Sequence, residues 1–364
     1  MNGLKTPLFE KHKALKGNMV LFGGYLLPTH YTSINHEHQV VRSKAGLFDV
    51  SHMGEFIVSG SDAESFLQSI TINDVSHLEV GQAQYTAMCY EDGGIVDDLI
   101  LYKFEKKFML VVNCNNIEKD MEWLKKNKFG DVKLSDISGK MGLLAIQGPK
   151  SRDILKTLVD VNLDTIKFYS FSICNIDDVE VIVSRTGYTG ELGYELYIGS
   201  NYITEIWDSL LDVGKKHGIN PVGLGCRDIL RLEMKYLLYG NDINEKTNPL
   251  EAGLGWITKL NKDFFIGKNT IYNSQDKINK HLVCIEMKEK SIPRKGYKIY
   301  VGEDLIGEIT SGTMSPSLGK GIGLGFVKSL YKSVGTDLMI EIRGTKKRAA
   351  IVKAPFYNNG SLMS

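Results

Sequence analysis

Cysteine is scarce in this sequence and is never closely spaced. The five cysteines, at positions 89, 114, 174, 226 and 284, include no C-x-x-C pair. An odd number of scattered thiols argues against a disulfide framework and is typical of a reducing compartment. The histidines supply no metal site either, because His36 and His38 fall in an expected helix, where residues two positions apart point away from each other. We therefore expect free buried thiols and no metal ligands.

Long apolar runs and an excess of one charge are also missing. No apolar segment approaches the roughly 20 residues that span a bilayer. Residues 1–16 lack an apolar core and are poor in arginine and serine, so we expect neither a secretory signal nor a transit peptide. The 44 basic and 43 acidic residues give a formal net charge of +1. This balance gives no reason to expect nucleic acid or an anionic membrane as the main partner, and the scattered cysteines predict a cytoplasmic protein.

The sequence does contain a repeated unit, in which a strand and a turn are followed by a helix. A chain of 364 residues is long enough for two or three domains. The predicted strands begin at Gly54, Phe108, Gly142 and Gly193, so the first and third units lie about 88 residues apart and the second and fourth about 85. The near-constant offset predicts two related α+β modules, each an antiparallel sheet with helices on one face.

The character of the chain changes after residue 281. Short strands separated by glycine and serine turns are predicted at 282–287, 296–301, 305–311, 321–327, 337–342 and 349–353. This spacing is typical of a small β barrel or sandwich. We therefore predict the α+β fold class with two domains. Residues 1–279 would hold both α+β lobes, with interleaving in sequence allowed, and residues 280–364 would form the barrel.

Residues 90–102 combine a turn with a strand that carries two adjacent acids. The D-G-G sequence at 92–94 predicts a hairpin turn, because glycine accepts the positive φ of tight turns. In the strand that follows, alternation places Asp97 and Asp98 on opposite faces. We expect Asp97 to face water and Asp98 to point inward, where a carboxylate is costly unless it has a use. The alternative is a strand end with two solvated aspartates.

The segment from Arg185 to Glu191, R-T-G-Y-T-G-E, joins two predicted strands. Its two glycines permit a tight loop with Tyr188 at the tip. Glu195 lies in the next strand, where its carboxylate can accept hydrogen bonds from a flat, nitrogen-rich ring. The alternative is an exposed hairpin with a solvated glutamate, and composition by itself favours that alternative.

A helix is predicted from Gly225 to Tyr236, with Arg227 in its first turn. A cation at this end opposes the helix dipole and therefore needs an anionic partner. The partner is either a ligand carboxylate or an acidic neighbour. Spacing by itself favours an ion pair with Asp228 or Glu233.

Eight motifs follow one another along the chain: Thr6–Phe9, Gly46–Gly54, Gly93–Leu99, Gln147–Pro149, Ser184–Glu191, Gly223–Asp228, Thr310–Gly312 with Ser315–Pro316, and Pro355–Tyr357. In order and spacing they resemble the aminomethyltransferase family, the T-proteins of the glycine cleavage system. The resemblance spans nearly the whole chain. It implies a three-lobed cloverleaf around a central cavity that holds tetrahydrofolate.

The resemblance also implies a reaction. The substrate would be an aminomethyl group carried on the lipoyl arm of the partner H-protein. The products would be ammonia, 5,10-methylenetetrahydrofolate and the dihydrolipoyl carrier. The sequence offers two other functions for the same fold. One is a folate-dependent demethylase, and the other is a folate-binding accessory protein for iron–sulfur assembly, whose Lys-Gly-Cys-type signature is not found here.

The resemblance assigns roles to individual residues. Asp98 corresponds to the catalytic aspartate, Glu195 would meet the pterin ring, and Arg227 would meet the polar part of the folate. The positions that match the lining of the folate cavity are Met53, Tyr85, Tyr102, Asn113, Tyr188, Glu195, Arg227 and Tyr236. The chain departs from the family pattern at its end, where no basic residue follows the Pro-Phe-Tyr motif. Lys353 is the nearest lysine in sequence.

Overall fold

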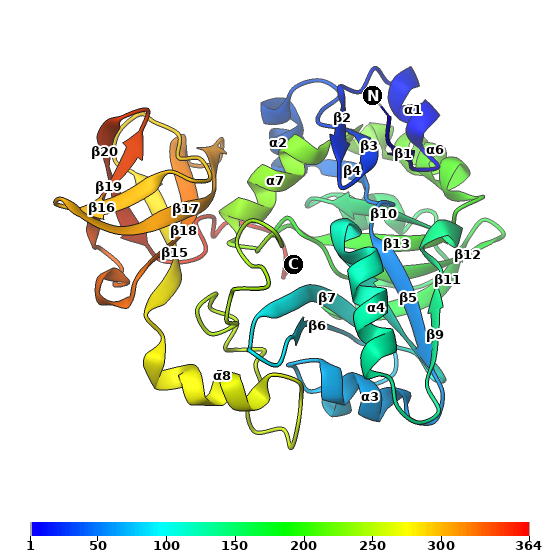
Figure 1. The fold of residues 1–364 in the computed structure, drawn as a ribbon. Helices are drawn as coiled ribbons and strands as arrows, with labels where there is room; N and C mark the ends of the chain where they lie inside the picture. The colour runs from blue at the N-terminus through cyan, green and yellow to red at the C-terminus, as the bar shows by residue number, and fades with distance from the viewer. Residues whose placement is uncertain (1, 364) are drawn as a thin grey trace.

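The computed structural model describes residues 2–363, which form three β-sheet lobes joined by helices and loops (Figure 1). The first lobe is a five-stranded antiparallel sheet in the order β6-β7-β8-β5-β9. Its strands are β5 (Gly54–Ser59), β6 (Ala83–Cys89), β7 (Ile95–Lys103), β8 (Lys107–Val112) and β9 (Lys133–Asp136). Helices α3 (Ala63–Ile70) and α4 (Ile117–Asn127) bury apolar side chains such as Phe66 and Leu124 against one face.

The second lobe is a six-stranded sheet in the order β11-β12-β13-β10-β4-β14. Its strands are β4 (Ala45–Asp49), β10 (Met141–Gln147), β11 (Phe171–Ile176), β12 (Val179–Ser184), β13 (Gly193–Gly199) and β14 (Ile219–Pro221). Helices α5 (Ser151–Leu155) and α6 (Ile203–Gly214) cover one face, where Trp207 is fully buried.

The order of strands confirms the predicted duplication. The run β6-β7-β8-β5 in the first sheet matches β11-β12-β13-β10 in the second, and the helices follow the corresponding strands. The lobes are interleaved, because β4 precedes β5 in sequence but belongs to the second sheet. One detail differs from the prediction: β4 and β14 pair in parallel.

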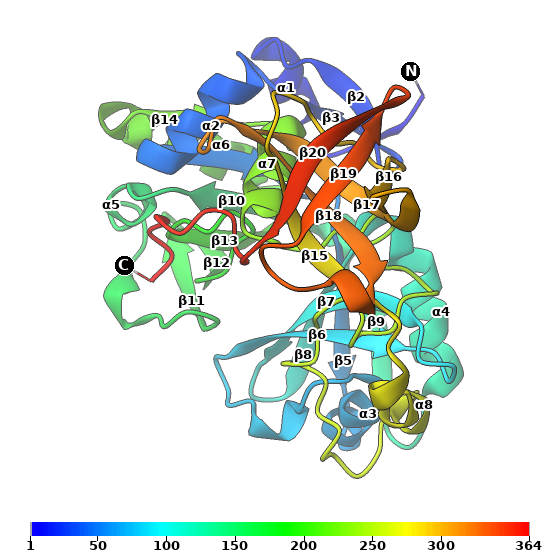
Figure 2. The same ribbon diagram turned by 90° about the vertical axis from the view of Figure 1, so that its left-hand side faces the viewer.

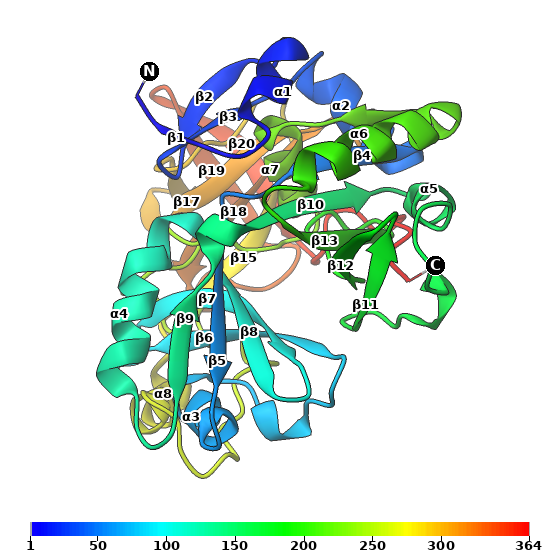
Figure 3. The ribbon, with the colours of Figure 1, turned by 90° about the vertical axis from the view of Figure 1, so that its right-hand side faces the viewer.

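The two sheets turn their helix-free faces toward each other (Figure 3). A shared apolar cluster contains Tyr102 and Val111 from the first sheet and Phe48 and Tyr197 from the second. Helices therefore lie on the outside of this pair, and strand residues on the inner faces meet residues far away in sequence. This arrangement positions the candidate site.

The third lobe is a closed barrel, as predicted (Figure 2). Its strands pair in the order β15-β18-β17-β16-β19-β20 around a core that includes Ile285, Ile299 and Ile340. They are β15 (Lys280–Met287), β16 (Lys298–Val301), β17 (Asp304–Ser315), β18 (Lys320–Lys328), β19 (Asp337–Ile342) and β20 (Thr345–Val352). The α+β fold class with two related sheets and a C-terminal barrel is thus confirmed.

The remaining elements lie outside the three lobes. They are β1 (Leu4–Lys5), β2 (Met19–Phe22), β3 (Tyr25–Pro28), α1 (Phe9–Ala14), α2 (Ile34–Ser43), α7 (Leu224–Glu233) and α8 (Lys268–Ser274). Strands β1, β2 and β3 pair with one another as a small three-stranded sheet in the order β1-β3-β2. Short 3₁₀ turns lie at Val75–His77, Cys114–Asn116, Ser138–Lys140, Leu163–Thr165, Lys215–His217, Gln275–Lys277 and Ser329–Tyr331. Within residues 2–363, none of the helices has the length and apolarity to cross a membrane.

Helix α7 is tied to the barrel through Glu233. The Glu233 carboxylate accepts hydrogen bonds from Ser315 Oγ at 2.5 Å, from His38 Nε2 at 3.0 Å and from the Arg42 guanidinium. Burial acts to raise the pKa of Glu233, but these partners overcome it and lower the pKa to about 2. The C-terminal end of α7, the helix that carries Arg227, is therefore fixed between the barrel and α2.

Candidate active site

The two adjacent aspartates lie on β7, directly after the predicted turn. Gly93 has a φ of +86°, and β6 and β7 pair in antiparallel as a hairpin requires. Asp97 points to the helix-covered face and has no exposed surface, whereas Asp98 points to the inner face and remains partly exposed. The expectation that Asp97 faces water is wrong, because α4 covers its side of the sheet.

Asp98 is held by two donors. Tyr85 Oη donates to Asp98 Oδ2 over 3.0 Å, and Asn113 Nδ2 donates to Asp98 Oδ1 over 3.0 Å. Burial, followed by the negative charge of Asp97, raises the pKa of Asp98 from its usual acidic range to about 7. A fixed carboxyl group with this pKa can stabilise a cation as the anion and carry a proton as the acid at neutral pH.

Arg227 has no acidic partner in the described part of the chain, so both predicted ion pairs are wrong. Asp228 pairs with Arg231 at 2.8 Å, and Glu233 is occupied by Arg42 and His38. The Arg227 guanidinium instead lies over the ring of Tyr188, 4.6 Å from its centroid. Burial lowers the pKa of Arg227, as expected for a cation that lacks a counter-ion.

Tyr188 and Tyr236 form an aromatic pair beside this cation. Their rings stack at 5.6 Å with an interplanar angle of 22°. The Tyr188 hydroxyl donates to the carbonyl oxygen of Leu237, which fixes the tip of the 185–191 loop. Two flat rings and a guanidinium together form a surface that suits a planar or anionic ligand.

The loop itself is packed inside the protein, so the exposed-hairpin alternative is wrong. Gln147 lies between the loop and β13: its Oε1 accepts from Thr189 Oγ1 at 2.7 Å, and its Nε2 donates to the Thr186 carbonyl at 3.2 Å. A Cβ atom on Gly187 would come within 2.1 Å of Gln147 Oε1. Position 187 therefore has to be glycine, because Gln147 approaches it so closely. Gln147 is the first residue of the Gln147–Pro149 motif noted in the sequence.

Glu195 is buried on β13 and makes one side-chain hydrogen bond. Thr186 Oγ1 donates to Glu195 Oε2 over 2.5 Å, while Oε1 receives no hydrogen bond in residues 2–363. Burial raises the pKa of Glu195. Tyr102 is fully enclosed, and its hydroxyl lies 3.3 Å from Thr186 Oγ1 and 2.9 Å from the Tyr197 hydroxyl. Tyr102 therefore reaches Glu195 through Thr186.

Electrostatic coupling shows that these groups belong to one region. The Asp98 charge adds to the raised pKa of Tyr188, and Arg227 counteracts the raised pKa of Glu195, although burial is the larger cause in both. Met53 is less closely placed, since it packs at the edge of the apolar cluster that contains Tyr102.

Three residues of this region were missed in the sequence. They are Tyr169, Trp256 and His52. The pKa of Tyr169 is raised by burial and then, in decreasing order, by Tyr236, Tyr102, Glu195 and Asp98, so Tyr169 lies among the predicted site residues. Trp256 stacks on Tyr85 at 6.1 Å although 64% of its surface is exposed. Burial and Arg227 lower the pKa of His52 to about 4. Tyr169 has a φ of +60°, a backbone conformation that is uncommon for a tyrosine. No sequence motif indicates that this residue belongs to the site.

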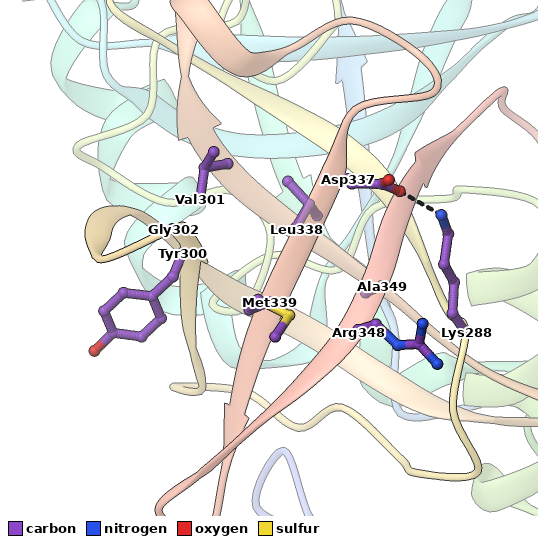
Figure 4. Close-up of a pocket in the computed structure, with 9 residues that line it drawn as sticks. All are labelled: Lys288, Tyr300, Val301, Gly302, Asp337, Leu338, Met339, Arg348 and Ala349. Atoms are coloured by element: carbon purple, nitrogen blue, oxygen red, sulfur yellow. Dashed lines mark hydrogen bonds and ion pairs between the residues drawn. The ribbon is translucent and has the colours of Figure 1, made fainter.

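A separate cavity of about 360 Å³ lies on the barrel (Figure 4). Two of its lining residues, Lys288 and Asp337, form an ion pair at one side of it. None of the predicted site residues lines it; its walls are Lys288, Tyr300, Val301, Gly302, Asp337, Leu338, Met339, Arg348 and Ala349. The cavity is thus distinct from the candidate site.

Comparison with known families identifies the fold and the family of the chain. The chain matches the GCVT N-terminal domain over residues 8–262 and the glycine cleavage T-protein C-terminal barrel domain over residues 280–358. The chain belongs to the glycine cleavage T-protein family. Relatives that match nearly the full length of the chain are named aminomethyltransferases, and the chain is accordingly an enzyme of the transferase class.

Individual T-proteins are similar along their full length. The chain is 47% identical over 354 residues to the aminomethyltransferase of Halothermothrix orenii, which covers 97% of this chain and 99% of the relative. It is 48% identical over 357 residues to that of Bacillus mycoides, with 97% and 98% covered. The crystal structure of glycine cleavage system aminomethyltransferase T from Bartonella henselae superimposes with a TM-score of 0.92 at 32% identity, covering 98% of this chain and 99% of the other.

Proposed function

We propose that this T-protein transfers the methylene carbon of an aminomethyl group to tetrahydrofolate, with release of ammonia. The donor would be the lipoyl arm of an H-protein, and the product 5,10-methylenetetrahydrofolate. The observation that carries the proposal is Asp98: a partly exposed carboxyl group, fixed by Tyr85 and Asn113, whose pKa is raised to about 7 by burial and by Asp97.

The side chains around Asp98 fit a folate. The free oxygen of the buried Glu195 can accept hydrogen bonds from the nitrogen-rich pterin ring. The stacked rings of Tyr188 and Tyr236 offer a flat apolar surface. Arg227, which lacks an acidic partner within residues 2–363, can bind the anionic end of the molecule. Met53, Tyr85, Asn113 and Tyr169 complete the proposed lining, and Tyr102 acts on the site through Thr186, which donates to Glu195.

The reaction places two demands on the protein. Bound tetrahydrofolate supplies the N5 and N10 nitrogens that accept the carbon. Positive charge develops at the aminomethyl carbon as its bond to nitrogen or sulfur breaks, and the Asp98 anion stabilises that charge. A proton must also leave the attacking amine, and a carboxyl group with a pKa near 7 can accept it. Fixed hydrogen bonds from Tyr85 and Asn113 keep the carboxylate in place before the reaction.

We place the enzyme in the cytoplasm, where all five cysteines would stay as the free thiols seen here. We also propose that residues 1–279 and residues 280–364 act as two domains. Support for this division comes from the first barrel strand, which begins at Lys280.

The test is formation of methylenetetrahydrofolate from glycine, with the other proteins of the cleavage system supplied and this chain present or absent. We expect product only when the chain is present and its carrier is lipoylated. Turnover of a methylated amine or sulfonium compound without the carrier would instead identify a folate-dependent demethylase. Folate binding without either turnover would identify an accessory protein.

A further inference from the structure

A third carboxyl group lies behind the two aspartates of β7. Asp120, on the inner face of α4, has no exposed surface and packs against Asp97, which has none either. The mechanism above does not use Asp120. Two carboxyl groups in contact away from water are costly if both are ionised, so their protonation needs an account.

The donors around the pair are unevenly distributed. Asp97 accepts three N–H bonds: from the Asn113 backbone at 3.1 Å, from Asn113 Nδ2 at 2.9 Å and from Asn116 Nδ2 at 2.6 Å. Neither oxygen of Asp120 accepts a hydrogen bond from any N–H or O–H group of residues 2–363. The neighbouring Lys119 is committed elsewhere, because its Nζ donates to the Val96 carbonyl at 2.5 Å and to the Tyr239 hydroxyl at 3.0 Å.

Asp120 lies one helical turn after Asn116, whose Nδ2 donates to Asp97 Oδ1 at 2.6 Å, so the Asp120 carboxyl is on the side of α4 that faces the carboxyl of Asp97. A hydrogen bond between two carboxyl groups requires that one of them keeps its proton. Three N–H donors favour the anion at Asp97, and the lack of donors favours the acid at Asp120.

We propose that Asp120 is a positioning residue that stays a neutral carboxylic acid at physiological pH and donates a hydrogen bond to the Asp97 anion. Asp97 in turn holds the side-chain amide of Asn113, and that amide donates to Asp98. The contacts therefore connect the helix-covered face of the sheet to the candidate catalytic carboxyl group of Asp98. The Asp120 acid donates to the Asp97 anion, which holds the Asn113 amide, and that amide donates to Asp98.

The charges around Asp120 agree with this assignment. Burial, with the Asp97 charge and the hydrogen bond to Asp97, raises the pKa of Asp120 to about 11, against a smaller opposing effect of Lys119. Asp98 acts in the same direction as Asp97. Other titratable groups near the pair include Tyr90, Cys114, Tyr239 and Glu245, and none of them donates to Asp120.

The first test is infrared spectroscopy in the carboxylic-acid C=O stretching region, on the full chain at pH 8. We expect the wild-type spectrum minus that of Asp120→Asn to contain one acid band that shifts in D2O. Glu122→Gln, an exposed change on the same helix, should leave that region unchanged. An absent acid band in the difference spectrum would overturn the proposal.

The second test uses activity, and this part of the inference rests on the proposed function. Asn keeps a neutral donor toward Asp97, so Asp120→Asn should hold kcat within about threefold of the wild type. Asp120→Leu removes the donor and should lower kcat about tenfold or more, with the KM for tetrahydrofolate changed by less than about threefold.

These outcomes separate the two hypotheses. If Asp120→Asn were as impaired as a folded Asp120→Leu, a charged Asp120 would be required and the proposal would fail. If Asp120→Leu did not fold, the infrared difference and the Asn variant would still decide. An inactive wild type with an intact acid band would refute the proposed function alone.

Discussion

The Tyr85 hydroxyl donates a hydrogen bond to Asp98 Oδ2 over 3.0 Å. Tyr85 lies on β6, the strand next to the one that carries Asp98. This bond stabilises the anionic form of Asp98, against burial and the charge of Asp97, which both favour the neutral form. The contact therefore helps to set the pH at which the candidate catalytic group ionises.

The first prediction concerns that pH. Because burial and Asp97 raise the pKa of Asp98 to about 7, activity that needs the anion should fall as pH decreases through about 7. Tyr85→Phe removes a donor to the anion, so the acidic inflection should move to higher pH. Single-turnover rates between pH 5 and 9, about two units either side of that pKa, measure both curves. An inflection that stayed in place would show that Tyr85 does not tune Asp98.

The second prediction concerns Asp98 itself. Asp98→Asn should fold and lose transferase activity about a hundredfold or more, the scale for a lost electrostatic group. A carboxyl group with a raised pKa contributes stability at low pH that is lost as pH rises through that pKa. The variant should therefore gain thermal stability relative to the wild type at pH 8 but not at pH 4. Equal activity in both proteins would remove Asp98 from catalysis.

Asp97→Asn is the matched control, and the structure changes what we expect of it. Asp97 accepts three N–H bonds in the core, and an amide in its place would leave donors facing donors. We expect a loss of about 1–3 kcal/mol in the free energy of unfolding. Activity per folded molecule should fall less than in Asp98→Asn. If Asp97→Asn lost more activity than Asp98→Asn, the catalytic role would belong to Asp97 and our assignment would be wrong.

The third prediction tests the pterin contact. Glu195→Gln should weaken tetrahydrofolate binding by about 1–3 kcal/mol, because a charged acceptor becomes a neutral amide in a buried position. Thermal-shift titration measures this, since ligand stabilisation grows with concentration. Identical titration curves for the variant and the wild type would place Glu195 outside the binding site.

The fourth prediction compares two cations. Arg227 lies over Tyr188 without an acidic partner in the described chain, whereas Lys353 is an exposed residue after β20. Arg227→Ala should reduce tetrahydrofolate affinity by about 1.5–3 kcal/mol, the range for a hydrogen bond to a charged group. Lys353→Ala should change it by less than about 0.5 kcal/mol. Calorimetric titration of both variants decides, and an equal loss in the two would contradict the assignment.

The fifth prediction concerns the uncharged C-terminal tail. Ser361 donates to Glu191 through its backbone N at 2.8 Å and its Oγ at 2.6 Å, and Leu192 N donates to Ser361 Oγ at 3.0 Å. The tail thus supports the loop that carries Tyr188. Ser361→Ala should lower the free energy of unfolding by about 1–3 kcal/mol, which chemical denaturation measures. Asn359→Ala, an exposed neighbour, is the control; equal stability of the two variants would show that the tail is dispensable.

Much of the architecture follows from local sequence signals. The D-G-G turn, the strand after it and the six barrel strands are specified by glycine conformation and by alternating apolar residues. The duplication follows from the offset between units, and the strand order of the two sheets agrees with it. The opposite facing of Asp97 and Asp98 follows from the two-residue period of a strand.

Tertiary structure decided what each face meets. Alternation cannot reveal that α4 closes over Asp97 or that the second sheet approaches the face of Asp98, since both covers come from other segments. Spacing in sequence favoured an ion pair between Arg227 and Asp228, but Asp228 pairs with Arg231 in the folded protein. Arg227 lies over the ring of Tyr188 instead. Tyr169 lies among the site residues because the loop before β11, which is distant in sequence from Asp98, brings it there. The burial and pairing of a charge depend on residues distant in sequence, and only the folded chain brings those residues together.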